Sequence, residues 1–504
     1  MTLSGLLQNI EILKSHGSLD QAIKGIAYDS REVKEGFLFA ALQGLHIDGH
    51  RYIEEAIARG AVAVLHSQAL SQYRREISYI QVENSRRALS PLAAALYNYP
   101  SRELTVVGVT GTDGKSSTVW FIYQLCEALK KSAGFISTVQ FKAQAGEEKN
   151  TLRQSTPEAP AIHKLLRQIK DSGSTIAIVE ATSHGLSSRT SRLANVDFDV
   201  AILTNVTHEH LEFHGTFAQY RSDKANLFRA LSRSPQKAHI PRFGVVNMDD
   251  PNHEYFRSQS DSPVFSYSLN NRQADLYASN VASYLSGSTF TLHHQAEEQS
   301  AAVSLPGLFN LENIMAAALT VIKLFEVPLA AVCAQLTAVK GVKGRMEIVD
   351  LGQPFRVFVD YAHTPGAFMR LLPLVKEHTR GKLTAVFGSA GERDIEKRVQ
   401  QGEIAARYCD RIILTDEDPR GEDPMTIIRQ IASAIEQAAP GKELFLVADR
   451  KEAIKLALTR AENEDTVLLL GKGHESTIIY STGAVHWDEH GTALLCLEEL
   501  GYRG

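Results

Sequence analysis

Short apolar runs alternate with helical patterns along most of this chain. In the first hundred residues, apolar runs at 36–42 and 61–65 flank a helical stretch at 52–59. The segment 1–15 has the pattern of an amphipathic helix, and it lacks the basic start and apolar run of a signal peptide. Pro100 disfavours continuation of the helix before it. The pattern therefore predicts a small α/β region that ends near residue 100.

Two further α/β regions follow in the pattern. A strand at 104–109, a glycine-rich turn and a helix from Ser116 open the first of them, and the stretch 240–305 is more β-rich. From about residue 340, short apolar strands are each followed by a polar turn. Strand–helix alternation of this kind is typical of mainly parallel sheets. The remaining strands are expected at 175–179, 200–204, 357–359, 383–387, 412–414, 444–447 and 467–470.

Length and composition narrow the class of protein. The chain has 504 residues, which suggests about three domains, and we place them at 1–100, 101–337 and 338–504. With 53 basic and 58 acidic residues the net charge is −5, without a block of like charges, which disfavours a nucleic-acid partner. No run of apolar residues is long enough to predict a membrane span. The four cysteines are too far apart for a disulfide framework or a zinc pattern, so we expect a cytoplasmic protein.

The strongest local signal is the run GVTGTDGKSS at residues 108–117, between a predicted strand and a predicted helix. Glycines there let backbone N–H groups approach phosphate oxygens, and the helix N-terminus favours negative charge. Lys115 would reach the outer phosphates, and the Ser116 hydroxyl would ligate Mg²⁺. Val109 stands where the strict phosphate-loop pattern has glycine, so the match is to a variant. The run predicts nucleotide binding but names no reaction.

Candidate metal ligands follow two later strands. Glu180 ends the strand at 175–179, beside the predicted phosphate loop, where a carboxylate is suited to bind Mg²⁺. Residues 204–215 read TNVTHEHLEFHG, which is compatible with a zinc cluster or with a magnesium site that has one histidine ligand. The lack of an HExxH spacing and of a nearby cysteine weighs against zinc. By pattern alone, His208 and His214 are surface histidines and Lys224 is an exposed helix lysine.

These motifs in this order resemble the Mur ligases, the ATP-dependent amide-bond ligases of peptidoglycan precursor synthesis. In the central region the resemblance rests on the phosphate loop, on EATSHGL at 180–186, on the histidine-rich segment and on KANLF at 224–228. Further motifs resemble the branch that adds the third stem-peptide residue to UDP-N-acetylmuramoyl-L-alanyl-D-glutamate, so the resemblance covers nearly the whole chain. They lie at 29–31, 36–39, 44–53, 344–347, 360–365, 391–394, 416–420 and 471–475.

The resemblance implies an α/β fold of three domains: a small N-terminal uridine-nucleotide domain, a central P-loop ATPase-like domain with a parallel sheet, and a C-terminal Rossmann-like domain. It implies that ATP and Mg²⁺ are used, that an acyl phosphate forms, and that an incoming amine attacks it. Lys115, Glu180, His210 and Lys224 would be catalytic. Ser116, Glu180, His210 and Lys224, the last as an N6-carboxylated lysine, would hold the metal. The implied ATP contacts are Gly111, Thr112, Asp113, Gly114, Lys115, Ser116, Ser117, Asn310, Asn313, Arg345 and Asp360.

The resemblance also assigns contacts to the UDP-muramoyl dipeptide. Gln154 and Ser155 depart from the family's Asn and Thr, Thr182 stands where serine is usual, and the loop before Arg192 is longer than the family pattern. The implied uridine-side positions are Tyr28, Ser30, Leu45, His46 and Ile47, and the implied sugar- and peptide-side positions are Gln154, Ser155, Thr156, Thr182, Thr190 and Arg192.

The third implied site binds the incoming diamino acid. The family pattern D-N-P-R for meso-diaminopimelate reads E-D-P-R here, so Asp418 replaces an asparagine. An added carboxylate favours a side chain that ends in a cation, such as L-lysine or L-ornithine. Retention of Arg420 favours meso-diaminopimelate instead. Of these two conflicting signals we follow Asp418, and we expect a basic diamino acid. The implied contacts are Arg393, Glu417, Asp418, Arg420, Gly471 and Glu475.

Two other functions compete with this one. A folylpolyglutamate-type ligase shares the central and final domains but lacks a first domain like residues 1–100. A P-loop switch or ATP-driven binding protein would need neither an amine site nor Lys224. We expect small-molecule partners only and a monomer. Because the implied ATP contacts come from two domains, we also expect the last domain to close over the site.

Overall fold

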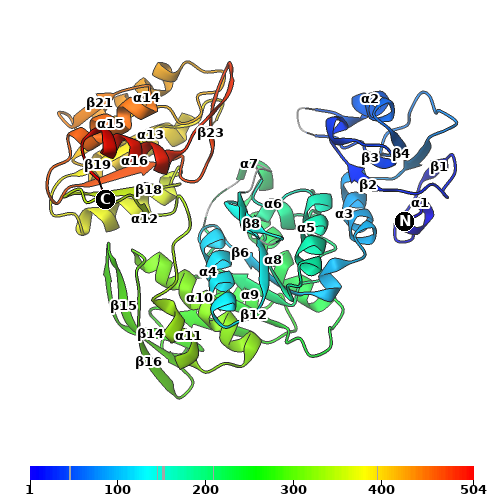
Figure 1. Cartoon of the computed structure of the whole chain (residues 1–504), viewed down its shortest axis with the longest axis horizontal. Coiled ribbons are helices and arrows are strands. Elements are labelled where there is room, and N and C mark those ends of the chain that lie inside the picture. The colour runs from blue at the N-terminus through cyan, green and yellow to red at the C-terminus, as the bar shows by residue number, and fades with distance from the viewer. Residues whose placement is uncertain are drawn as a thin grey trace. The chain divides into compact units, whose positions relative to one another are not determined.

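The computed structural model describes residues 1–44, 47–144, 146–149, 154–207, 209, 211–393 and 395–503 (Figure 1), with the backbone alone at 149, 211 and 212. The described chain forms two compact units. One contains residues 1–281, 289–303 and 308–339, and the other contains 282–288, 304–307 and 340–504. Helices and mainly parallel sheets make up both units, so the predicted α/β class is confirmed.

The first unit begins with a five-stranded sheet in the order β1-β5-β4-β3-β2. All neighbours are parallel except β1, which pairs antiparallel with β5. Buried aliphatic side chains from the strands pack against the helices. The elements are α1 (Leu3–Leu6), β1 (Lys14–His16), β2 (Gly25–Ala27), β3 (Phe37–Ala40), α2 (Ile53–Ala58), β4 (Ala61–His66), β5 (Ser78–Gln81) and α3 (Ser85–Leu96), with 3₁₀ helices at Ser30–Glu32, Gly49–Tyr52 and Pro100–Glu103.

The predicted amphipathic helix over residues 1–15 is wrong. Only the single turn of α1 is helical, and β1 lies where the helix was expected to end. Backbone hydrogen bonds explain the difference: Leu3 N donates to Gln21 O at 2.8 Å, and Leu13 N donates to Gln81 O at 2.8 Å. Pairing with distant strands and loops satisfies these groups outside a helix.

An eleven-stranded sheet follows, in the order β16-β15-β14-β13-β12-β11-β6-β10-β7-β8-β9. The strands from β14 through β7 in this order are parallel to their neighbours, and β8 and β9 add an antiparallel edge. The strands are β6 (Thr105–Thr110), β7 (Ala133–Ile136), β8 (Gln140–Lys142), β9 (Glu148–Lys149), β10 (Ile176–Glu180), β11 (Val200–Leu203), β12 (Phe243–Asn247), β13 (Val264–Ser268), β14 (Leu276–Tyr284), β15 (Gly287–His294) and β16 (Glu297–Val303).

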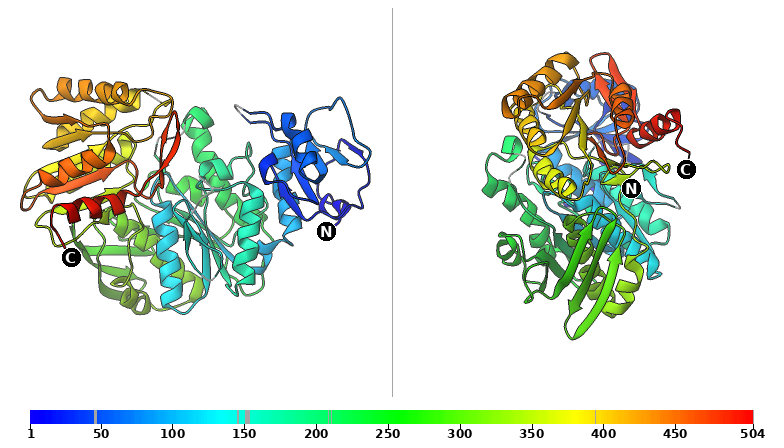
Figure 2. Two further views of the ribbon diagram at one scale, coloured as in Figure 1. Left: turned by 45° about the horizontal axis from the view of Figure 1, so that its top comes forward. Right: turned by 90° about the vertical axis from the view of Figure 1, so that its left-hand side faces the viewer.

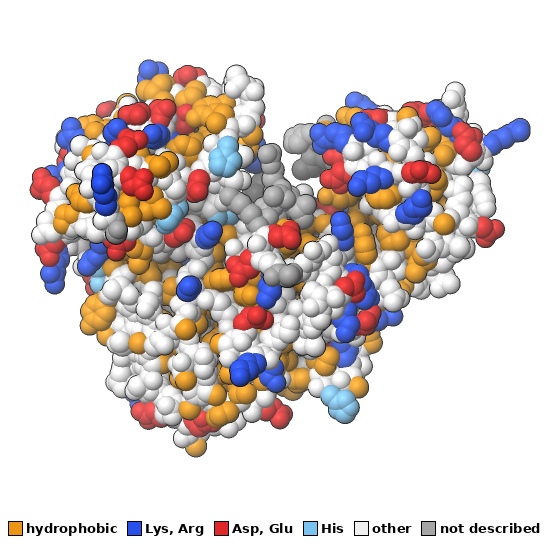
Figure 3. Space-filling model, viewed as in Figure 1, with side chains coloured by type: hydrophobic (Ala, Val, Ile, Leu, Met, Phe, Trp, Pro, Cys, Tyr) orange, Lys and Arg blue, Asp and Glu red, His pale blue; other side chains and the backbone are white. Residues whose placement is uncertain are grey.

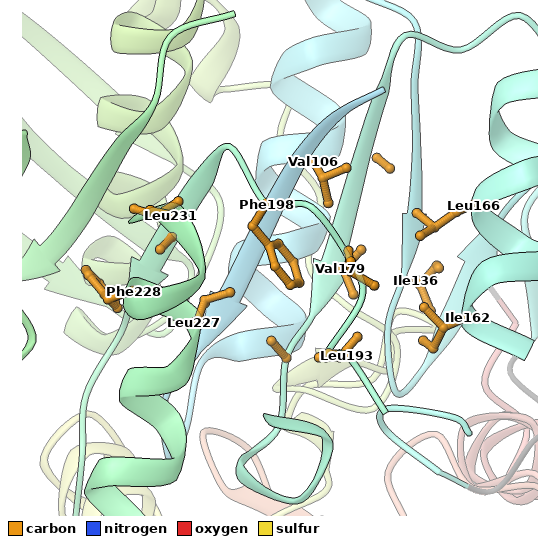
Figure 4. Packing of buried hydrophobic residues seen from close by; sticks show 14 of the residues in the cluster. Val106, Ile136, Ile162, Leu166, Val179, Leu193, Phe198, Leu227, Phe228 and Leu231 are labelled. Atoms are coloured by element: carbon orange, nitrogen blue, oxygen red, sulfur yellow. The ribbon is translucent and has the colours of Figure 1, made fainter. Parts of the chain in front are cut away.

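Helices cover both faces of the central sheet (Figure 2). Figure 4 shows side chains of α5 and α8 packed against strand residues such as Val106 and Val179, within a fully buried cluster. On the other face α4 and α10 pack against each other. The helices are α4 (Lys115–Ala128), α5 (Ala159–Asp171), α6 (Ser183–Leu186), α7 (Leu211–His214), α8 (Phe217–Arg233), α9 (His253–Arg257), α10 (Leu308–Phe325) and α11 (Leu329–Leu336).

Helix α10 is the one helix of the described residues that is long and apolar enough to cross a membrane by length and composition. Its mean hydropathy is 1.5, but 72% of it is buried inside the fold. Burial of this kind is typical of the core helix of a globular domain.

The second unit contains a six-stranded sheet in the order β17-β18-β22-β19-β20-β21, parallel except for β17, and a separate β23–β24 hairpin. Its core packs α15 and α16 against the sheet. The elements are β17 (Glu347–Ile348), β18 (Arg356–Asp360), α12 (Pro365–Glu377), β19 (Leu383–Phe387), α13 (Ile395–Tyr408), β20 (Arg411–Leu414), α14 (Pro424–Ala438), β21 (Glu443–Leu446), α15 (Arg450–Thr459), β22 (Thr466–Leu470), β23 (Thr477–Tyr480), β24 (Gly483–His486) and α16 (Glu489–Glu499).

Charged side chains of both signs are interspersed on the surface that Figure 3 shows. This mixture agrees with the near-balanced composition of 53 basic and 58 acidic residues. A protein that binds nucleic acid usually carries a basic face instead.

Candidate active site

The predicted phosphate loop joins β6 to α4, and two of its glycines are required by geometry. Gly111 has φ +152°, and a Cβ there would lie 1.8 Å from Thr204 Oγ1. Gly114 has φ +78°, and its Cβ would lie 2.2 Å from Asn313 Oδ1. A left-handed backbone with no room for a side chain accepts only glycine. The close contact also brings Asn313 of α10 to the loop, where ATP contact was predicted.

A neighbouring segment after β11 holds the phosphate loop in shape. Thr112 N donates to Asn205 O at 2.8 Å, and Asp113 N donates to Asn205 Oδ1 at 3.0 Å. The Thr204 hydroxyl donates to Asp113 O at 2.6 Å. Lys115 folds back over the loop, since its Nζ donates to Thr112 O at 2.8 Å. The first N–H groups of α4, which include Ser117, have no partners within the helix and form an anion-binding end.

Ser116 and Glu180 meet at the ends of α4 and β10. The Ser116 hydroxyl donates to Glu180 Oε2 at 2.8 Å, and Thr138 donates to the same carboxylate from its backbone N at 2.9 Å and from its hydroxyl at 2.8 Å. Glu180 is buried. A carboxylate and two hydroxyls are hard oxygen ligands, so this donor set fits Mg²⁺. Among the described side chains, no three His, Cys, Asp or Glu residues gather as a metal cluster.

Lys224 lies in the interior, so its interpretation as an exposed helix lysine is wrong. Its residue is 1% exposed, and its Nζ donates to Gly111 O at 2.6 Å and lies 4.4 Å from the centre of the Tyr220 ring. Burial holds the pKa of Lys224 well below its ordinary value, and the nearby Lys115 charge lowers it further. Sequence pattern alone did not show that Lys224 lies on the buried face of α8.

His214 is also buried, so its interpretation as a surface histidine is wrong. Its Nδ1 lies 2.7 Å from Asp223 Oδ2, and its Nε2 lies 3.1 Å from Ser183 Oγ. These contacts join α7, α8 and α6 next to Lys224. His208 and the predicted metal ligand His210 lie outside the described residues.

Several predicted substrate positions form a connected group behind Glu180. Thr156 Oγ1 donates to Glu180 O at 2.9 Å and accepts from Thr182 Oγ1 at 2.9 Å. Arg192 donates to Thr156 O at 2.9 Å and pairs with Glu158 at 2.9 Å, and Glu158 also pairs with Arg86 of α3 at 2.7 Å. The structure thus brings Thr156, Thr182 and Arg192 together.

The other predicted substrate positions are more dispersed. Thr190 is buried and its hydroxyl donates to His184 O and Ser187 O, so it supports the local turn. Gln154 and Ser155 are half-buried beside Thr156.

On the uridine side, the Ser30 hydroxyl donates to Glu55 at 3.1 Å. Burial and the nearby Glu158 raise the pKa of Tyr28 to about 12, so Tyr28 is a neutral hydrogen-bond donor. Ile47 is exposed, and the predicted positions Leu45 and His46 lie outside the described residues.

The remaining predicted ATP positions divide between the two units. Asn310 is buried on α10 in the first unit. Arg345 and Asp360 lie in the second unit, where the Arg345 guanidinium stands 4.7 Å from the centre of the Tyr361 ring. The Asp360 carboxylate accepts from Met346 N and Ala362 N, each at 2.7 Å, which fixes the turn after β18.

The predicted amino-acid positions converge at the ends of β20 and β22. Gly471 has φ +102°, and a Cβ there would lie 3.0 Å from Glu417 Oε2. That oxygen is buried and has no hydrogen-bond partner among the described residues, and burial raises the pKa of Glu417. By contrast, Asp418 Oδ1 accepts from Lys472 Nζ at 2.9 Å and from Ile479 N at 3.0 Å.

Two arginines complete this group. Arg420 is half-buried with φ +56°, and its Nε has no hydrogen-bond partner among the described residues. Arg393 is exposed, on a loop that reaches this site because Gly391 N donates to Asp418 O at 2.8 Å. Both guanidinium groups are suited to carboxylate recognition.

Sequence reasoning missed residues that organise these sites. Asn205 braces the phosphate loop, Thr138 holds Glu180, and Lys472 pairs with Asp418. Asn205 and Lys472 lie in motifs that carry the family resemblance, so these motifs could have pointed to them. Thr138 had none, because its role depends on the pairing of β7 with β10.

The comparisons with known proteins agree with this arrangement. Family models match at residues 22–97 (Mur ligase family, catalytic domain), 109–321 (Mur ligase middle domain) and 344–473 (Mur ligase, glutamate ligase domain). The UDP-N-acetylmuramyl-tripeptide synthetase of Roseiflexus sp. (strain RS-1) is 47% identical over 96% of each chain, and that of Treponema denticola is 43% identical over 98% of this chain and 97% of its own length.

A solved structure of a UDP-N-acetylmuramoyl-L-alanyl-D-glutamate–2,6-diaminopimelate ligase is 27% identical, with a TM-score of 0.66, and covers 99% of both chains. The predicted three-domain fold is therefore confirmed. Relatives of this identity over almost the full length, together with the three family models, establish the family. The chain belongs to the Mur ligase family and is an ATP-dependent, ADP-forming ligase of peptidoglycan biosynthesis.

Proposed function

We propose that this chain joins a basic diamino acid, L-lysine or L-ornithine, to the D-glutamyl carboxylate of UDP-N-acetylmuramoyl-L-alanyl-D-glutamate. The names of the similar tripeptide synthetases support the acceptor. The observation that carries the catalytic part is the buried Lys224 amine, 2.6 Å from the carbonyl of Gly111 in the phosphate loop. Such a group is costly to bury, and titratable groups with strongly shifted pKa values cluster at functional sites.

The reaction has two steps. A carboxylate oxygen of the substrate attacks the γ-phosphorus of ATP, the bond to ADP breaks, and an acyl phosphate forms. The amine of the diamino acid then attacks the acyl carbon, loses a proton, and expels phosphate as the amide bond forms. Lys115 and the N-terminal N–H groups of α4 would stabilise negative charge on the transferring phosphoryl group.

The oxygen donors around Glu180 suit Mg²⁺. Ser116 and Glu180 would hold one ion, and by the family resemblance Glu180 and His210 would help to hold a second, with carboxylated Lys224 as a further ligand. Bound Mg²⁺ supplies positive charge against the phosphate oxygens.

Lys224 would act as a carbamate. Its nitrogen lone pair attacks carbon dioxide, an N–C bond forms, and the nitrogen loses a proton. Burial favours the neutral amine that this reaction requires. The product is a carboxylate-like oxygen ligand in place of a cation beside the phosphate loop.

The preference for a basic diamino acid is supported by Glu417. Its buried Oε2 has no hydrogen-bond partner among the described residues and lies against Gly471, so a distal ammonium group would satisfy it. Arg393 or Arg420 would hold the α-carboxylate. On the acceptor side, Tyr28 and Ser30 would contact the uridine, and Thr156, Thr182 and Arg192 the sugar-linked peptide.

The test of this function is phosphate release from ATP by the purified chain, with each substrate omitted in turn. We expect release only when the UDP-muramoyl dipeptide and an amino acid are both present. Turnover with ATP alone would favour a P-loop switch, and turnover with a folate in place of the UDP-substrate would favour a folylpolyglutamate-type ligase.

An amino-acid panel then tests the third substrate. We expect L-ornithine or L-lysine to give the highest kcat/KM, and a strong preference for meso-diaminopimelate would contradict this choice. We place the enzyme in the cytoplasm, since its four cysteines are buried and unpaired. We also expect a monomer. Size-exclusion chromatography with light scattering checks the monomer.

A further inference from the structure

Lys472 is a buried cation that none of the roles above uses. Its side chain is 0% exposed, and its Nζ donates to Asp418 Oδ1 at 2.9 Å and to Glu475 Oε2 at 2.5 Å. A buried ammonium group is stable only when it is paired and hydrogen-bonded. These two carboxylates supply that pairing.

Both carboxylates belong to positions where contact with the diamino acid was predicted. Glu475 is partly exposed, and its second oxygen accepts from Tyr361 OH at 3.3 Å, so Lys472 and Tyr361 hold the carboxylate from two sides. Asp418 is more buried, and the ammonium group of Lys472 together with Ile479 N engages one of its oxygens. The charge of Asp418 is therefore balanced within the protein.

This pairing changes the role expected for Asp418. From sequence, the added carboxylate was expected to attract the distal ammonium group of the substrate. In the structure Lys472 pairs with both Asp418 and Glu475, but the Asp418 side chain is only 12% exposed and that of Glu475 is 35% exposed. Glu417 Oε2 has no hydrogen-bond partner among the described residues. The carboxylates open to a substrate cation are those of Glu417 and Glu475.

We propose that Lys472 is a positioning residue for the amino-acid site, which fixes Glu475 toward the diamino acid and withdraws Asp418 from it. The inference rests on the proposed function, because it concerns the recognition of that substrate. Lys472 acts through Glu475 and does not contact the substrate itself.

A double-mutant cycle between Lys472→Met and Glu475→Gln tests the proposal. Each single variant is expected to raise KM for L-ornithine or L-lysine about tenfold, the effect of one charged hydrogen bond. The double variant is expected to be no more than about twice as impaired as the worse single variant, because both changes remove the same interaction. KM for ATP and for the UDP-substrate is expected to stay within about twofold, which a general structural defect would not allow.

Asp418→Asn supplies the second arm. We expect it to change KM for the basic diamino acid less than about fivefold, since Lys472 keeps Glu475 as a partner. In the Lys472→Met background the same change is expected to raise the stability of the fold but to leave KM for the diamino acid high, because it removes a stranded buried carboxylate without fixing Glu475 again. Lys455→Met, which loses only a surface pair with Glu499, is the matched lysine control.

Multiplicative effects of Lys472→Met and Glu475→Gln would overturn the proposal, as would a rise in KM above about fivefold for Asp418→Asn. If Lys472→Met does not fold, the Asp418→Asn result decides alone. A wild-type chain that releases no phosphate with any amino acid would instead refute the proposed function, before any variant is measured.

Discussion

Burial gives the amine of Lys224 a chemistry that exposed lysines on other helices lack. It is 1% exposed beside the phosphate loop, whereas Lys164 on α5 points to solvent. We expect Lys224→Ala to lose about 100-fold or more in kcat, the scale of a lost electrostatic contact to the transition state. Phosphate release measures this, with Lys164→Ala as the control.

Bicarbonate should not restore Lys224→Ala, because the amine that carries the carbamate is gone. Mass spectrometry of the native wild-type protein should show the mass of one added carbon dioxide. Full activity of Lys224→Ala would contradict the assignment.

We propose that the Glu417 carboxylate binds the distal ammonium group of the diamino acid. Glu417→Gln removes the charge of a buried carboxylate but keeps its shape. We expect KM for L-ornithine or L-lysine to rise about tenfold or more, as for the loss of a hydrogen bond to a charged group. An amino acid without the distal amine, such as L-norvaline, should be affected little, and an equal effect on both would refute the contact.

His163 on α5 is 0% exposed, and neither ring nitrogen has a hydrogen-bond partner among the described residues. Burial lowers its pKa from 6.5 to about 3, so below pH 6.5 the unfolded chain binds a proton that the folded chain does not. This group therefore lowers stability as the pH falls from 6.5 toward 3, by about 1.4 kcal/mol per pH unit.

Comparison with His163→Leu isolates this effect. Between pH 7 and pH 5, the wild type should lose about 2 kcal/mol more free energy of unfolding than the variant, in denaturant titrations at both pH values. Equal losses would show that His163 takes up its proton in the folded state.

At the scale of elements, a buried ion pair joins the segments that carry the amino-acid site. Arg450 of α15 binds Glu489 of α16 through two hydrogen bonds, at 2.8 and 2.6 Å. It also donates to Asp416 O at 2.8 Å and to Leu470 O at 2.7 Å, the residues directly before Glu417 and Gly471. One guanidinium group thus fixes the ends of both site loops.

We expect Arg450→Met to destabilise the second unit by about 3–5 kcal/mol, since it leaves Glu489 buried without its cation. Urea unfolding of the full chain measures this. Lys451→Met is the matched control: Lys451 is the next residue of α15, and the loss of its exposed pair with Glu499 of α16 should change the midpoint little. Equal midpoints for the two variants would contradict the prediction.

The elements themselves were largely readable from pattern. The strands at 383–387 and 175–179 are β19 and β10, displaced by at most one residue, because buried parallel strands are continuous apolar runs. The prediction of an N-terminal helix is wrong, because the backbone N–H groups of Leu3 and Leu13 donate to distant backbone carbonyls that no local pattern reveals.

At the scale of the whole molecule, the predicted ATP residues are divided between two compact units. The phosphate loop, Asn310 and Asn313 are in one unit, and Arg345 and Asp360 are in the other. The family resemblance implies that all of them contact one nucleotide, and the closure of the last domain that we expect from the sequence stays a prediction. We expect the radius of gyration from small-angle X-ray scattering to fall when a non-hydrolysable ATP analogue and the UDP-substrate are added. An unchanged radius would count against closure.

The sequence by itself determined the α/β class, the phosphate loop and the family, because these depend on local spacing: glycines at 111 and 114, a lysine and serine after them, and apolar runs at strand length. It also located Glu180 and the loops that carry Glu417 and Gly471. Only the tertiary structure decided which of these side chains are free to act. Lys224 and His214 are buried, and Asp418 is paired with Lys472 while Glu417 is not. Burial and pairing are set by residues far apart in the chain, whose contacts leave no local pattern.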